Sequence, residues 1–589
     1  MTGTVAELVG RALAELGAGH VFGVVGSGNL HLTNALIAAG VPFTAARHEN
    51  GAATMADAWA RTSGRVAVVT THQGCGLTNA TTGIGEAAKS RTPLIVLTAD
   101  TQAAAVHSNF RIDQDALARS VGAVAERVHS PASAVADVVR AFRRARNDRR
   151  TVVLSVPLDV QAAPAPASVV VPVLPPAPRV RPDDDAVARL AAVLAAARRP
   201  VFVAGRGARA ARAELAALAE RTGALLATSA VAKGLFSGED FDLGISGGFS
   251  SPLTARLIGE ADLVVGWGCA LNMWTTRHGR LIDPAAAVVQ VDLEESALGA
   301  HRPVDRPLEL GVVGDCALTA QDVLAALGPA APPRDGAPPQ DGASPENSAE
   351  AGDGAEGGAP REGAAPASSW RTPELAARIA REGSWRDVPF EDLSTAERID
   401  PRVLSRELDA VLPAERVVAV DSGNFMGYPS QYLSVPDEHG FCFTQAFQSV
   451  GLGLATAVGA ALAQPHRLPV LGTGDGGFLM GIAELETAVR LGLPLVCVVY
   501  DDAAYGAEVH HFAGREDGDV PLDTVVFPDV DIAAIGRGFG ADGVVVRTVE
   551  DLAAVRAWTE GPRDRPLVVD AKIASDGGAW WLAEAFRGH

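Results

Sequence analysis

The clearest evidence for the fold is the segment from Val470 to Gly506, which reads VLGTGDGGFLMGIAELETAVRLGLPLVCVVYDDAAYG. It predicts a buried strand that ends in a glycine-rich turn around Asp475, then a helix, then a second buried strand that ends on Asp501 and Asp502. In open sheets built from such units, ligands bind at the edge formed by the carboxyl ends of the strands. The stretch therefore predicts a parallel α/β domain with a ligand site beside these aspartates.

The turn itself favours a phosphate-containing ligand. Unpaired N–H groups at the start of the helix suit a phosphate, and glycines let the backbone approach it closely. A carboxylate at Asp475 suits this ligand only if a hard cation lies between them, as Mg²⁺ does when it binds one or two carboxylates plus phosphate oxygens. Asp502 follows Asp475 by 27 residues, so we expect both carboxylates at one cation. The alternative is that Asp475 only shapes its turn and that the aspartate pair caps the next element.

The rest of the chain repeats this alternation in three parts. Strand-like runs such as HVFGVVG and PLIVLTA alternate with helical patterns in residues 1–170, and the same holds for residues 185–327 and 372–589. Residues 328–369 are almost entirely Ala, Gly, Pro, Ser and acidic residues, so we expect a disordered linker there. The predicted fold class is α/β, with three open, mostly parallel sheets that carry helices on both faces.

Composition narrows the classes of function. The 589 residues carry a formal charge of -20, which argues against a nucleic-acid partner because such partners are bound by clustered Lys and Arg. No apolar run has the length of a bilayer-spanning helix, and the N-terminus lacks the pattern of a secretory signal. The five cysteines are odd in number and scattered, as in proteins with reduced thiols. We therefore expect a cytoplasmic protein.

The GDG turn and the later aspartate pair, which leads into YG, resemble the signature of thiamine-diphosphate-dependent enzymes of the acetolactate synthase, benzoylformate decarboxylase and pyruvate decarboxylase type. The resemblance implies that Mg²⁺ is held by Asp475, Asp502 and the backbone carbonyl of Ala504. It also implies that the cofactor's diphosphate lies on the turn formed by Gly474, Gly476 and Gly477. The family usually has Asn-Asn or Asn-Asp at the pair. The additional charge of Asp501 is expected to weaken diphosphate binding unless this side chain points away or finds a donor.

Segments near the N-terminus resemble the same family. The cofactor must lose a proton from its reactive carbon, and in the family a Glu beside the aminopyrimidine ring promotes this step; the matching residue is Glu49, in VPFTAARHENGAATMADAWAR. The alternative is that Glu49 only occupies the favourable first turn of a helix.

Three polar residues of this part resemble residues that line the family's substrate cavity. His72, in VVTTHQGCGLTN, matches a histidine that transfers protons in benzoylformate decarboxylase, and Ser27, in VVGSGNL, matches a serine that meets the substrate carboxylate. The ordinary alternatives are a hydrogen-bonded residue at a strand end and a helix cap. Gln114, in FRIDQDAL, resembles a glutamine of acetolactate synthases.

The segments VVAVDSGNFMG and FTQAFQSVGLGLATAVGAAL complete the resemblance. It implies that Gly423 and Asn424 meet the diphosphate and that Val450 holds the cofactor in its bent shape; the alternative for Val450 is an ordinary core valine. In the family, the domain of Glu49 faces the domain of Asp475 in a second subunit. A homodimer or homotetramer with active sites at the subunit interface is therefore expected.

The resemblance covers all three domains and implies an enzyme that acts on a small 2-oxo acid. The first reading is a carboligase of acetolactate synthase type, which decarboxylates a pyruvate-like 2-oxo acid and transfers the acyl-anion equivalent to a second carbonyl compound. The alternative is a non-ligating decarboxylase of benzoylformate decarboxylase type, and a third reading is an inactive regulatory homologue that binds the cofactor. Some acetolactate synthases bind FAD in the middle domain, but the segment AGRGARAARAE is too general a pattern to predict FAD.

Deletion of residues 330–367 is expected to leave the Tm of the protein nearly unchanged, because shortening a long flexible connection changes its closure entropy little. Scanning calorimetry of the full-length and deleted proteins checks this expectation. A large fall in Tm would show that the segment packs against the domains.

Overall fold

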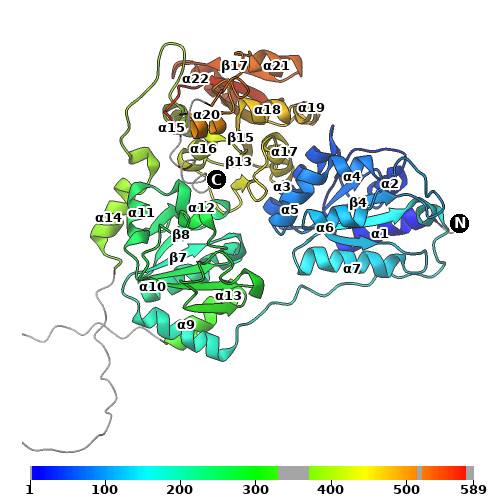
Figure 1. Cartoon of the computed structure of the whole chain (residues 1–589), viewed down its shortest axis with the longest axis horizontal. Helices are drawn as coiled ribbons and strands as arrows, with labels where there is room; N and C mark the ends of the chain where they lie inside the picture. The colour runs from blue at the N-terminus through cyan, green and yellow to red at the C-terminus, as the bar shows by residue number, and fades with distance from the viewer. Residues whose placement is uncertain (1–2, 329–369, 514–519, 579–580, 582–589) are drawn as a thin grey trace, which may run out of the picture.

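The computed structural model describes residues 3–328, 370–513, 520–578 and 581, so the expected linker lies almost wholly outside the described residues. It contains three six-stranded sheets. All pairings of neighbouring strands within them are parallel. Figure 1 shows three bodies in which helices cover the sheets, so the predicted α/β class is confirmed. Within the described part of the chain, no helix has both the length and the apolar character needed to cross a bilayer.

The first sheet has the strand order β2-β1-β3-β4-β6-β5. Its strands are β1 (Val21–Gly23), β2 (Phe43–Ala45), β3 (Ala67–Thr71), β4 (Leu94–Asp100), β5 (Val124–Arg127) and β6 (Thr151–Pro157). Its helices are α1 (Val5–Leu16), α2 (Leu30–Ala38), α3 (Glu49–Ser63), α4 (Cys75–Asn79), α5 (Thr81–Lys89), α6 (Gln114–Ser120), α7 (Ala134–Asn147) and α8 (Leu158–Ala162).

The middle sheet has the order β12-β11-β10-β7-β8-β9. Its strands are β7 (Pro200–Ala204), β8 (Leu225–Thr228), β9 (Asp242–Ile245), β10 (Leu263–Trp267), β11 (Ala287–Asp292) and β12 (Leu310–Val313). The helices around it are α9 (Asp184–Ala196), α10 (Arg212–Thr222), α11 (Pro252–Gly259), α12 (Met273–Thr276) and α13 (Cys316–Leu327). Helix α14 (Pro373–Glu382) also packs here, because its Ile379 lies in one of the two cores of this sheet.

The third sheet has the order β14-β13-β15-β16-β18-β17. Its strands are β13 (Arg416–Val420), β14 (Phe441–Phe443), β15 (Leu468–Gly474), β16 (Val496–Asp501), β17 (Asp542–Val546) and β18 (Leu567–Lys572). Its helices are α15 (Pro401–Val411), α16 (Gly427–Tyr432), α17 (Gly453–Ala463), α18 (Asp475–Met480), α19 (Ala483–Arg490), α20 (Gly506–Phe512), α21 (Ile532–Gly538) and α22 (Leu552–Glu560). In the register of β15 and β16, Gly474 pairs with Tyr500, so Asp475 and Asp501 follow at the same edge of the sheet.

The first and third sheets share one hydrophobic core, which includes Val69 and Val96 of the first sheet and Leu471 of the third. Helices α3 and α17 lie side by side in this core (Figure 1). Their contact is close, since a Cβ at Gly459 of α17 would lie 2.2 Å from the carbonyl oxygen of Met55 in α3. A glycine at this position is therefore required by the approach of the two backbones.

Arg61, in α3, contacts all three parts of the molecule, the first and third through its buried side chain and the middle part through its main-chain carbonyl. Its guanidinium pairs with Asp57 at 2.6 Å and with Glu86 at 2.7 Å, and it donates to the carbonyl of Phe443 in the third sheet at 3.0 Å. From the middle part, Arg209 donates to the Arg61 carbonyl at 2.9 Å. Since buried charges persist only when they are paired and hydrogen-bonded, these contacts constrain the relative positions of the three sheets.

Arg61→Ala is expected to destabilise the protein by about 3–5 kcal/mol, because it leaves two buried carboxylates without their cation. Denaturant unfolding followed by circular dichroism measures the change. The control is Arg11→Ala, which removes only an exposed pair with Glu15 and should cost less than about 1 kcal/mol. Equal stability of the two variants would contradict the role of Arg61.

Candidate active site

The glycine-rich turn lies where β15 passes into α18, with Asp475 buried at the first position of the helix. A Cβ at Gly476 would lie 2.6 Å from Cε1 of Tyr505, and one at Gly477 would lie 2.6 Å from Oδ2 of Asp421. Larger side chains would clash at both positions. The turn therefore presents backbone, with no room for side chains, beside the carboxylate of Asp475.

Two carboxylates meet at this edge. Burial, followed by the charges of Asp502 and Asp501, raises the pKa of Asp475 to about 7. Burial also raises the pKa of Asp502 to about 6, and its Oδ1 accepts the N–H of Ala504 at 3.2 Å. Carboxylates that repel one another in a buried setting suit a cation between them. Within the described residues, no group of three or more His, Cys, Asp or Glu side chains is arranged to hold a metal ion.

The additional carboxylate, Asp501, is paired with a cation of its own domain. Its Oδ2 lies 2.6 Å from Nζ of Lys572, on the neighbouring strand β18, and its Oδ1 accepts the N–H of Ala503 at 2.9 Å. Lys572 also pairs with Asp529 at 2.6 Å. Asp501 thus finds the donor expected from the sequence, while it shares with Asp475 the lining of the cavity at this edge.

The backbone after Asp502 is held in an unusual conformation. Ala503 has a φ of 58°, a left-handed conformation that non-glycine residues adopt only under constraint. The N–H of Phe527 binds the Ala503 carbonyl at 2.8 Å, and Ala504 forms an antiparallel bridge with Val526. The segment 525–527 therefore fixes the backbone that carries the Ala504 carbonyl.

Asp421, at the end of β13, is a buried carboxylate that the sequence analysis did not select. It accepts the N–H groups of Gly451 and Leu452 at 3.1 and 3.3 Å and the hydroxyl of Thr473 at 3.2 Å. Burial raises the pKa of Asp421 to about 6. The side chain ties the turn that carries Val450, which is 39% exposed rather than part of the core, to the glycine-rich turn. Its position after a strand, like those of Asp475 and Asp501, was the available signal.

Gly423 and Asn424 follow β13 at the same edge. Gly423 has a φ of 148°, and a Cβ there would lie 2.8 Å from Cε1 of Phe425. Asn424 is buried, and its carbonyl accepts the indole N–H of Trp581 at 3.2 Å. The structure thus brings the predicted residues of the third part to one edge of one sheet.

Glu49 begins α3 in the first part of the chain and is only half-buried. Its Oε2 accepts the amide of Asn79 at 3.1 Å. A Cβ at Gly76 would lie 3.4 Å from Oε1 of Glu49 and 3.1 Å from Cβ of His72, so Gly76 lies between these two predicted residues. Glu49 and His72 therefore share one region at the carboxyl ends of the strands.

His72 and Ser27 are brought together from sequence positions 45 residues apart, with Nε2 and Oγ at 3.4 Å. The other ring nitrogen of His72, Nδ1, lies 2.9 Å from the carbonyl of Gln73. Since a carbonyl only accepts, Nδ1 carries a proton, and Nε2 is the ring nitrogen beside the serine hydroxyl. The ring of Phe110 packs edge-on against His72 at 4.8 Å.

Gln114 is buried, and both ends of its amide are used within the domain. Its oxygen accepts the N–H of Gly74 at 2.9 Å, and its nitrogen donates to the carbonyl of Ala99 at 3.0 Å and to Ser155 at 3.2 Å. These contacts hold the Gly74 turn, two residues from His72. Gln114 therefore supports the turn beside His72 through buried hydrogen bonds.

Each of the three parts of the chain matches a domain of one family of known proteins. Residues 3–120 match the N-terminal thiamine pyrophosphate (thiamine diphosphate) binding domain of thiamine pyrophosphate enzymes, residues 187–327 match their central domain, and residues 421–571 match their C-terminal thiamine pyrophosphate binding domain. The chain belongs to the thiamine pyrophosphate enzyme family. It is 30% identical to a sulfoacetaldehyde acetyltransferase of Rhodobacter capsulatus, over 99% of this chain and 96% of that protein.

Two other relatives have different names. A probable 2-ketoarginine decarboxylase of Pseudomonas aeruginosa is 30% identical over 93% of this chain and 90% of its own length. A probable acetolactate synthase large subunit of Methanocaldococcus jannaschii is 26% identical over 85% of this chain and 80% of its own length. The thiamine pyrophosphate enzymes that this chain resembles thus include transferases and a decarboxylase.

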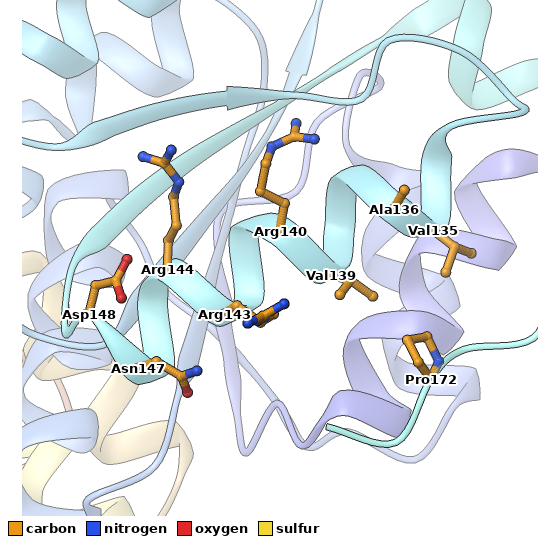
Figure 2. A pocket seen from close by; sticks show the side chains of 9 residues that line it. All are labelled: Val135, Ala136, Val139, Arg140, Arg143, Arg144, Asn147, Asp148 and Pro172. Atoms are coloured by element: carbon orange, nitrogen blue, oxygen red, sulfur yellow. The ribbon is translucent and has the colours of Figure 1, made fainter. Parts of the chain in front are cut away.

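A cavity of about 300 Å³ opens at the thiamine pyrophosphate-binding edge of the third sheet. Its lining belongs wholly to that domain and includes Asp475, Gly476, Met480, Asp501, Tyr505 and Phe527. A larger hollow of about 610 Å³ lies elsewhere, along α7 (Figure 2). There Val135 and Val139 face Pro172, while Arg140 and Arg144 point to the other side of the helix and pair with Glu126. The larger hollow contains none of the residues predicted for the site.

Asp475→Ala is expected to abolish the Mg²⁺-dependent binding of thiamine pyrophosphate, because it removes one of the two carboxylates available to the cation. Titration calorimetry with and without Mg²⁺ measures the effect. The control is Asp564→Ala, which removes an exposed carboxylate that precedes β18, at the opposite edge of the sheet, and pairs with Arg565. Unchanged Mg²⁺-dependent binding by the Asp475 variant would contradict the assignment.

Proposed function

We propose that this thiamine pyrophosphate enzyme is a carboligase of acetolactate synthase type, which decarboxylates a pyruvate-like 2-oxo acid and transfers the acyl group to a second carbonyl compound. The observation that carries the proposal is the pair of acidic sites, Glu49 in the first domain and Asp475 with Asp502 in the third. These sites suit the two ends of the cofactor. The relatives named as an acetyltransferase and an acetolactate synthase support group transfer as the outcome.

The residues present fit the cofactor at both ends. Asp475, Asp502 and the carbonyl of Ala504 would hold Mg²⁺. The diphosphate would lie on the backbone around Gly474, Gly476, Gly477, Gly423 and Asn424, where the glycines have no side chain of their own to hold it away from the main chain. Val450 would pack under the bend of the cofactor, and Glu49 would hold a proton at its pyrimidine ring.

Thiamine pyrophosphate, when bound, supplies a nucleophilic carbon that adds to the 2-oxo acid and accepts the electron pair left by CO₂. The chain supplies proton transfer and orientation around it. His72 is placed for proton transfer at Nε2, because Nδ1 is fixed by the Gln73 carbonyl. Ser27, whose Oγ lies 3.4 Å from the same nitrogen, would orient the substrate carboxylate.

A homodimer or homotetramer would complete the site. None of the described residues of the first domain lines the cavity beside Asp475, which supports a Glu49 contributed by a second copy. Large exposed apolar side chains gather after the strands of both domains: Val25, Leu30, Val106, Phe110 and Ile112 in the first, and Phe447, Val450, Leu479, Met480 and Phe527 in the third. Apolar surface of this kind favours coverage by another protein surface, and a second copy would bring the two edges together.

A non-ligating decarboxylase is the second candidate, favoured by the Ser27–His72 pair at 3.4 Å, which could protonate the product carbon and release an aldehyde. Incubation with thiamine pyrophosphate, Mg²⁺ and a panel of 2-oxo acids that includes pyruvate and benzoylformate, with CO₂ detection and mass spectrometry of products, separates the candidates. A 2-hydroxy ketone or 2-hydroxy acid supports the carboligase, and an aldehyde alone supports the decarboxylase. Absence of CO₂ across the panel would favour an inactive regulatory homologue.

Glu49→Gln is expected to lower turnover by about 10²–10⁴-fold while leaving the fold intact, because the amide cannot exchange a proton with the pyrimidine ring. Steady-state rates, together with the Tm, measure this. Glu15→Gln, at an exposed position of α1, is the control with the same chemical change. Near-normal turnover by the Glu49 variant would refute its role in activation.

A further inference from the structure

Glu484 lies in the first turn of α19, in the third domain. Its side chain contacts the first domain at the residues directly before Glu49. Its Oε1 accepts the backbone N–H of His48 at 3.0 Å and that of Arg47 at 3.2 Å, and Oε2 lies 3.3 Å from the latter nitrogen. The side chain is 3% exposed, and Thr487 of its own helix donates to Oε2 at 2.7 Å. A buried carboxylate of one domain thus binds the main chain of the other.

The first turn of α3 is shaped to receive this carboxylate. A Cβ at Gly51 would lie 2.1 Å from Oε1 of Glu484, so the approach depends on a glycine there. His48 caps the helix by accepting the N–H of Asn50 at Nδ1, 3.1 Å away. Glu484 accepts the N–H of this cap residue, His48, and that of Arg47 before it. Hydrogen bonds from N–H groups to a buried carboxylate are stronger than neutral ones, so they fix the backbone at the residue before Glu49.

Glu484 belongs to the same pair of short helices as the diphosphate turn. Helix α18 begins at Asp475, and α19 follows after Gly481 and Ile482. A Cβ at Gly481 would lie 2.8 Å from the carbonyl oxygen of Gly451, next to Val450. Glu484 therefore extends from an element that is itself packed against the cofactor-binding turns.

We propose that Glu484 is a positioning residue that sets the orientation of the Glu49 carboxyl by binding the main chain of Arg47 and His48 across the domain boundary. The proposal rests on the proposed function, in which Glu49 acts on the cofactor. Glu484 itself does not touch the cofactor or the substrate. Through this contact it determines where the first turn of α3 places the carboxyl of Glu49.

The neighbouring Glu486 offers a matched control. It lies on the same helix and contacts the same residue, but it pairs with the side chain of Arg47 and not with the backbone. Glu484→Ala removes the acceptor, Glu484→Gln keeps an oxygen for the two N–H groups, and Gly51→Ala displaces the carboxylate from the other side. Comparison of these variants with Glu486→Ala separates the backbone contact from a general loss of charge between the domains.

The first readout is amide hydrogen exchange by mass spectrometry on a peptide that covers Arg47 and His48, with and without thiamine pyrophosphate and Mg²⁺. We expect faster exchange in Glu484→Ala and Gly51→Ala, and unchanged exchange in Glu484→Gln and Glu486→Ala. The second readout is calorimetric cofactor affinity, which we expect to change less than about threefold because the diphosphate end remains intact. The third is turnover, where Glu484→Ala should lower kcat by about 10–100-fold at similar KM, the range found for residues that orient a functional group. Glu484→Gln should retain most of the activity.

Unchanged exchange in Glu484→Ala, or an equal loss of kcat in Glu486→Ala, would overturn the proposal. A fall in kcat that follows Tm across all four variants would overturn it too, since that result indicates a purely structural role. If the unmodified protein turns over no 2-oxo acid, the exchange readout still decides whether Glu484 holds the main chain, and the proposed function fails separately. If the unmodified protein is active and Glu484→Ala is equally active, the proposed function stands and the positioning role is wrong.

Discussion

The arrangement of the three domains depends on one buried guanidinium. Arg61 is paired with two carboxylates of its own domain, reaches a carbonyl of the third sheet, and receives a hydrogen bond from the middle domain through its own carbonyl. Such a group is costly to bury unless every partner is present, so the three surfaces are held in one relative position. The close packing of α3 on α17 then follows, and with it the place of Glu49 at the end of α3.

Charge is handled differently at the two ends of the predicted site. At the third sheet, Lys572 pairs with Asp501, and the neighbouring Asp475 and Asp502 have raised pKa values, which is the electrostatic condition for holding a cation. At the first sheet, single hydrogen bonds fix the two polar groups. Asn79 donates to the carboxyl of Glu49, and the ring of His72 donates to the Gln73 carbonyl. In the proposed function, one edge would hold an anion with its metal, and the other would move single protons.

The sequence was sufficient to predict the parts that depend on local pattern. Strand and helix alternation predicts three parallel sheets, and the turn around Asp475 is read from its glycines. Contacts between distant segments could not be predicted in this way: Lys572 lies 71 residues from Asp501, and Glu484 lies 436 residues from His48. Helix α14 follows the long linker, yet it packs against the middle sheet. Its Ile379 is buried in a core of that sheet, and this contact between distant segments sets the position of the helix. Gln114 was selected by resemblance, and only the partners of its amide reveal that it supports the Gly74 turn.

The first and third sheets have the same topology, since their strands follow one order when numbered within each domain. Each chain thus contains the scaffold twice, and in the proposed function the first copy would carry the acid for the ring and the second the acids for the metal. When two such chains associate about a twofold axis and the first scaffold of one meets the third of the other, the same meeting is generated a second time by symmetry. A closed pair then has as many complete sites as chains, and no half-site is left facing solvent.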